Sequence, residues 1–177
     1  MTRADFLKLV KMDAEALKSI ARRSQLPFRS DDEGRRLGEY TEMEAFLLIL
    51  ATDLAGDPGI NRTTAANIVQ SFAMSLYRWW PEIGATARAL VGGRGADDEV
   101  LCGRMWLSGS GQPVPFCAPA SMLGTILEQH KPVVRIVATS ASRGMAVLMR
   151  RADWAGLEVP PDLFKFRYDH DTSPDAT

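Results

Sequence analysis

Hydrophobic residues in the first half of the chain recur at steps of three and four, which is the spacing of amphipathic helices. Asp13 and Thr41 stand just before two such runs as N-caps, and Glu44 completes a capping box with Thr41. The pattern predicts helices over residues 4–10, 14–23 and 42–55, a fourth from Thr63 or Thr64 to Trp80, and a fifth over 82–91. The two short helices at the start are close enough in sequence to form a helix-turn-helix pair.

The pattern changes after the glycine-rich residues 92–95, where short strand-like runs begin. It predicts a hairpin of strands over 99–107 and 113–118, a helix over 120–130, a strand over 132–139, a helix over 141–155 and a final strand over 162–168. The acidic residues 169–177 are expected to form a disordered tail. We therefore expect an α+β protein with a mainly helical module over 1–91 and a small mixed module over 96–168 that serves self-association, sensing or partner binding.

The net charge is −1, so a polyanion would have to be bound by a local surface. Residues 1–30 contain seven basic and three acidic residues. In the second predicted helix, Lys18 and Arg22 are four residues apart and share one face, whereas Leu17 and Ile20 point into the core. A helix held in this way fits the major groove of DNA, where lysine and arginine bind bases and phosphates. The alternative is a solvated helix end, where the helix dipole favours basic side chains.

The order of these features resembles the MerR-type winged-helix family, whose architecture is shared by phage excisionases. In that family the recognition helix carries a leucine followed by a basic residue, and it ends in an arginine before a proline-containing segment. The wing ends with an arginine and a tyrosine just before a capped, acidic helix. The matching residues in this chain, in order, are Leu17, Lys18, Arg22, Leu26, Pro27, Arg36, Tyr40, Thr41 and Glu42.

The resemblance covers roughly residues 5–72 and implies a mainly helical winged helix-turn-helix module. It implies sequence-specific binding of double-stranded DNA in transcriptional regulation, with an origin in a prophage or mobile element. The recognition helix would contact DNA through Lys18 and Arg22, and the wing through Arg35, Arg36 and Tyr40. With the neighbouring arginines, the candidate DNA-binding residues are Lys18, Arg22, Arg23, Arg29, Arg35, Arg36 and Tyr40. The chain has no sustained heptad repeat, so the expected homodimer needs a contact other than the family's coiled coil.

Other chemistry is sparse. His130 and His170 have no ligand partner at helical spacing, so no metal or cofactor is predicted. Cys102 and Cys117 lack the spacing of a zinc site, and we interpret them as reduced thiols of a cytoplasmic protein. Ser140 begins the last predicted helix, whose N-terminus either binds an anion or is simply capped.

No paired acid and base is evident, so we expect a protein that is not an enzyme, and an enzyme with a cleft in the second module is a weaker interpretation. No apolar run is long enough to span a bilayer, so no membrane partner is predicted. The alternative function is a protein–protein adaptor whose fold does not bind DNA. A protein partner or a small effector at the second module is compatible with either function.

Overall fold

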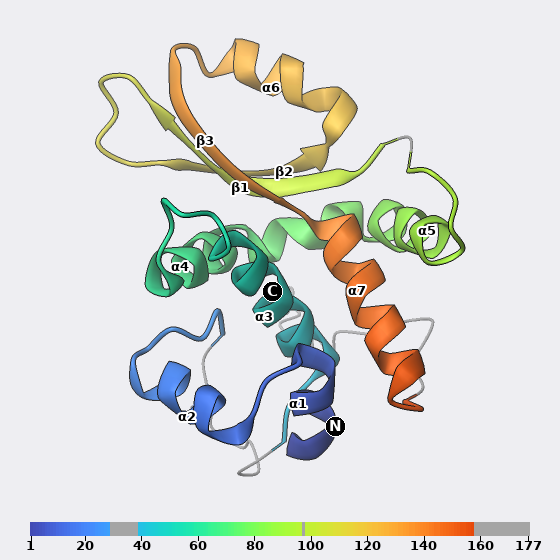
Figure 1. Cartoon of the computed structure of the whole chain (residues 1–177). Coiled ribbons are helices and arrows are strands. Elements are labelled where there is room, and N and C mark those ends of the chain that lie inside the picture. Colours follow the sequence, from blue (N-terminus) through green and yellow to red (C-terminus); the bar gives the residue numbers. More distant parts are fainter. Residues whose placement is uncertain (29–38, 97, 158–177) are drawn as a thin grey trace, which may run out of the picture.

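The computed structural model describes residues 1–28, 39–96 and 98–157, and the predicted strand over 162–168 and tail over 169–177 lie outside them. The fold is α+β, as predicted (Figure 1). The α-helices are α1 (Arg3–Val10), α2 (Ala14–Arg22), α3 (Glu42–Leu54), α4 (Arg62–Phe72), α5 (Trp80–Val91), α6 (Leu123–Gln129) and α7 (Ala141–Trp154). Two 3-10 helices are also present, η1 (Ala73–Trp79) between α4 and α5 and η2 (Ala120–Met122) before α6. The strands are β1 (Val100–Leu107), β2 (Val114–Pro119) and β3 (Val133–Ser140).

Side-chain caps fix where α1–α4 and α7 begin. Asp13 accepts a hydrogen bond from the main chain of Ala16, and Thr41 forms the predicted capping box with Glu44. The prediction of a continuous helix from Thr63 or Thr64 to Trp80 is wrong at its start and in its second half.

The side chain of Asn61, not a threonine, caps α4 by accepting from the main chain of Thr64. From Ala73 the chain forms η1 instead of an α-helix. Ala73, Leu76 and Trp79 follow at steps of three, which is the period of a 3-10 helix. The apolar spacing alone therefore did not distinguish the two kinds of helix.

The three strands form one antiparallel sheet in the order β2-β1-β3, and the predicted hairpin is its β1–β2 pair. Figure 1 shows α6 on one side of this sheet and the other helices on the opposite side. Prolines at positions 113, 115 and 119 lie in or beside the edge strand β2. Because proline lacks an N–H group, these residues limit the pairing of that edge.

Helix α7 packs among the helices of the first half of the chain, next to α3 and α5 (Figure 1). Gly144 lies so close to Leu50 of α3 that an added Cβ would overlap its side chain. One hydrophobic cluster contains buried residues from α1–α5 and α7 and from the strands β1 and β3. The glycines at 92–95 therefore connect α5 to the sheet without separating two cores, and the predicted modules share one core across that boundary.

Candidate nucleic-acid interface

The second predicted helix is α2 in the structure, and its basic residues lie on the exposed face. Leu17 and Ile20 are buried in the core, which fixes the rotation of the helix about its axis. Lys18, Arg22 and Arg23 are exposed on the other side. Figure 1 shows α2 at the periphery of the molecule, at the end away from the sheet. The predicted separation of an apolar inner face and a basic outer face is therefore present.

Lys18 is engaged by one acid of its own helix, because its Nζ atom lies 2.8 Å from Oε1 of Glu15. The two side chains are 49% and 81% exposed, so solvent screens the pair. A phosphate can therefore replace Glu15 at little cost. Arg22 and Arg23 form no ion pair with any residue that the structure describes.

A hollow of about 410 Å³ adjoins α2, between that helix, the end of α1, the last turn of α3 and the start of α4. Its lining includes three basic residues, Lys11, Arg23 and Arg62, and one acid, Asp13. We call this hollow the basic groove. Its wall is held together by a hydrogen bond of 3.2 Å from Gln25 Nε2 to the hydroxyl of Thr63.

Sequence reasoning missed Lys11 and Arg62 as candidate residues. Lys11 ends α1 in a left-handed conformation, with φ of 57°, and Arg62 opens α4 some fifty residues later in the chain. No spacing rule links two residues so far apart. Only the packing of α1 and α4 against α3 brings their charges to the same side of the molecule.

A second hollow, of about 420 Å³, lies between α1 and the end of α7. Lys8, Lys11, Arg151 and Trp154 line it, and Lys11 also lines the basic groove. Trp154 is 81% exposed. An exposed indole beside three cations is a surface on which a nucleobase can stack.

The remaining predicted contacts are placed differently. Tyr40 is half-buried and stacks on Phe6 with 4.1 Å between the ring centroids, so core packing accounts for its ring. Its main chain also bonds to the first residue, because the Met1 amino group donates to the Tyr40 carbonyl over 2.6 Å. Arg29, Arg35 and Arg36 lie outside the described residues.

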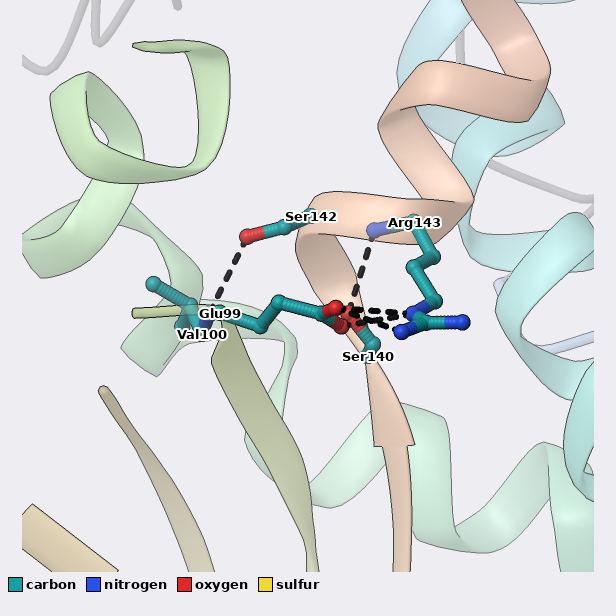
Figure 2. A network of polar contacts seen from close by, with 5 residues as sticks. All are labelled: Glu99, Val100, Ser140, Ser142 and Arg143. Atoms are coloured by element: carbon teal, nitrogen blue, oxygen red, sulfur yellow. Dashed lines mark hydrogen bonds and ion pairs between the residues drawn. The ribbon is translucent and has the colours of Figure 1, made fainter. Parts of the chain in front are cut away.

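The start of α7 is a capped helix whose anion is supplied by the chain (Figure 2). Ser140 accepts a hydrogen bond from the main chain of Arg143, and the main chain of Val100 donates to Ser142 over 3.0 Å. The Arg143 side chain holds both carboxylate oxygens of Glu99, with Nε at 2.9 and 2.8 Å. These hydrogen bonds keep the pKa of Glu99 below its usual value. Of the two interpretations left open by the sequence, the geometry favours the cap.

Within 1–28, 39–96 and 98–157, no three histidine, cysteine, aspartate or glutamate side chains are grouped to hold a metal ion. No helix in the same ranges has the length and apolarity needed to cross a membrane.

Trp79 and Trp80 are both half-buried. The indole N–H of Trp79 donates to the Cys117 carbonyl over 2.7 Å, and the ring of Trp80 packs edge-on against Phe46. Contacts with β2 and with α3, respectively, therefore account for the two side chains.

No family model, no curated protein and no solved structure matches this chain.

Proposed function

We propose that this protein binds double-stranded DNA in a sequence-specific manner and regulates transcription. Helix α2 would enter the major groove, with Lys18 and Arg22 directed at base edges and phosphates. Arg23, Lys11 and Arg62 would hold the adjacent backbone along the basic groove. The MerR-type resemblance adds Arg29, Arg35, Arg36 and Tyr40 as wing contacts, and it suggests a prophage or mobile-element regulator.

One observation carries the proposal: α2 is anchored by Leu17 and Ile20 and turns three basic side chains outward. Five cations, Lys11, Lys18, Arg22, Arg23 and Arg62, lie on or beside this helix, against the acids Asp13 and Glu15. The rest of the chain offsets that charge, because the net value is −1. Because the protein as a whole is nearly neutral, it has no general attraction for acidic molecules. A local basic surface on such a protein favours binding of a specific polyanion at that surface.

We further propose that the binding unit is a homodimer. One short helix makes few contacts, and two-fold pairing of protomers on a two-fold DNA site doubles them. About five phosphate contacts for each protomer give a salt slope of about −4 to −5 in the logarithm of affinity per protomer.

The first test measures the fluorescence anisotropy of a labelled random-sequence duplex in rising salt. The Lys18→Ala/Arg22→Ala variant is expected to bind at least tenfold more weakly than the wild type at low salt. Its salt slope should be shallower by about 2, because two phosphate contacts are lost. Both side chains are exposed, so the variant should fold normally.

The matched control is Arg88→Ala/Arg94→Ala. These arginines are also exposed, and they lie at the end of α5 and in the segment after it, well away from α2 in Figure 1. The control changes the net charge by the same amount and should leave both affinity and salt slope unchanged. Equal losses in both variants would show that only the overall charge matters and would end the proposal.

The basic groove is tested by Lys11→Ala/Arg62→Ala. If the groove holds the DNA backbone, this pair lowers affinity for all duplexes alike and makes the salt slope shallower by about 2. A variant with normal affinity would restrict the interface to the outer face of α2.

The second candidate function is a protein–protein adaptor, and one feature of the sheet favours it. Strand β3 is an edge strand, and its Val134 and Ile136 side chains are 68% and 37% exposed. Such an edge can pair with a strand of another chain. If the wild type binds no duplex at low salt, the adaptor replaces the regulator, and Val134→Lys/Ile136→Lys should then abolish the protein complex.

A further inference from the structure

The two cysteines of the chain are direct neighbours across two strands. Cys102 lies in the central strand β1 and Cys117 in the edge strand β2, and the antiparallel register pairs them with each other. Opposed residues in such a ladder have Cα atoms about 4.5–5.5 Å apart, which lies within the span that a disulfide bridges. The Sγ atoms lie 2.6 Å apart, and both cysteines are free thiols in this structure.

A covalent bond between these two cysteines would reinforce the attachment of the edge strand β2. Pro115 and Pro119 flank Cys117 in β2 and donate no hydrogen bonds to the ladder. The Cys117 carbonyl also accepts from Trp79 Nε1, so this residue connects the edge strand to η1. A bond from Cys102 to Cys117 would tie this edge strand and its helical support to the centre of the sheet.

We propose that Cys102 and Cys117 form a redox site that a hydroperoxide converts reversibly into an intramolecular disulfide. The Cys117 thiolate attacks one peroxide oxygen, so an S–O bond forms, the O–O bond breaks and water leaves after protonation. The Cys102 sulfur then attacks the sulfenic sulfur of Cys117, so the S–S bond forms and a second water leaves. In balance, two thiols lose two electrons and two protons, and one hydrogen peroxide becomes two waters.

Burial supports this order of events. Cys117 is partly exposed, whereas Cys102 is fully buried. Burial raises the pKa of the Cys102 thiol well above its usual value, so this thiol is a poor first nucleophile. A resolving cysteine that is buried beside the reactive one acts before the sulfenic acid can be oxidised further.

The test uses the intact chain, fully reduced and then treated with one equivalent of hydrogen peroxide. Mass spectrometry should show the loss of about 2 Da, and dithiothreitol should restore the original mass. Trypsin cleaves after Arg104, which separates the two cysteines into different peptides. A non-reducing digest should therefore contain the Cys102 and Cys117 peptides as one linked species that reduction splits.

Cys102→Ala and Cys117→Ala are the matched controls, because a free cysteine packs as a small apolar residue and alanine keeps that character. Neither variant should lose mass on treatment. The proposal is overturned if the wild type gains oxygen on either cysteine, or links two chains, without yielding the internal linked peptide. Because no DNA is present, the result is independent of the proposed function.

Discussion

Gly103 shows how a single residue can decide whether the sheet forms. It lies in the central strand β1 opposite Ala138 of β3. A Cβ at this position would overlap main-chain atoms of Val137 and Ala138, and a main chain cannot move aside as the tip of a flexible side chain can. Only glycine lets the two strands approach so closely.

Gly103→Ala is therefore expected to lower the free energy of unfolding by about 3 kcal/mol, at the upper end of the cost of overpacking. Chemical denaturation of the wild type and the variant measures this difference. The control is Gly124→Ala in α6, where the new methyl group meets nothing within 4 Å.

The control should be neutral or stabilising by up to about 1 kcal/mol, because alanine is the better helix former. A stable Gly103→Ala protein would mean that β1 and β3 are not packed as described.

At the scale of elements, the join between the sheet and α7 rests on a small polar network. Glu99, just before β1, holds Arg143 in the first turn of α7, and Ser142 of that turn accepts from the main chain of Val100. The Glu99 side chain is only 15% exposed, unlike that of Arg143 at 71%. The largely buried Glu99 carboxylate therefore depends on this ion pair more than the exposed Arg143 side chain does.

Glu99→Gln is expected to lower the free energy of unfolding by about 1 kcal/mol at neutral pH, because the charge-assisted bonds to Arg143 are lost. The pKa of Glu99 is lower in the folded chain than its usual 4.5. A lowered pKa contributes stability that is complete above the unfolded value and disappears as the pH falls through the folded value. The difference in the free energy of unfolding between the wild type and Glu99→Gln should therefore have its full size above about pH 5.5 and shrink below about pH 4.5.

Glu128→Gln is the control for this measurement. Glu128 of α6 pairs with Lys131, which lies just after that helix, but the two side chains are 68% and 61% exposed. An exposed pair contributes little, so the control should change stability by less than about 0.5 kcal/mol at any pH. A pH-independent gap for Glu99→Gln would show that the ion pair is not its cause.

At the scale of the whole molecule, the proposed DNA-binding helix and the sheet lie at opposite ends of one shared core (Figure 1). Arg151 of α7 donates to the Leu9 carbonyl of α1 over 2.9 Å, which fixes the helix before α2 to the last helix of the described chain. The basic surface is therefore carried by a rigid body and not by a detachable module.

A homodimer in which each rigid protomer presents one α2 helix predicts the symmetry of the DNA target. Selection of bound duplexes from a random pool with the purified wild type should recover a sequence with two-fold symmetry. Its half-sites should be centred about 10 base pairs, or a multiple of that, apart. Enrichment of a single, asymmetric site would support DNA binding but contradict the homodimer.

The sequence by itself determined most helices, the hairpin and the outward-facing Lys18 and Arg22. Those features depend on local rules, namely caps such as Thr41, apolar periodicity and the geometry of one helix turn. It did not distinguish η1 from a continuation of α4, since steps of three fit both.

Only the tertiary structure decided which distant residues meet. It placed Lys11 and Arg62 beside Arg23, exposed Trp154, paired Cys102 with Cys117 and bound Glu99 to Arg143. Each of these follows from strand register or from the packing of helices that are far apart along the chain. Register and packing are set by the whole core at once, and no local spacing encodes them.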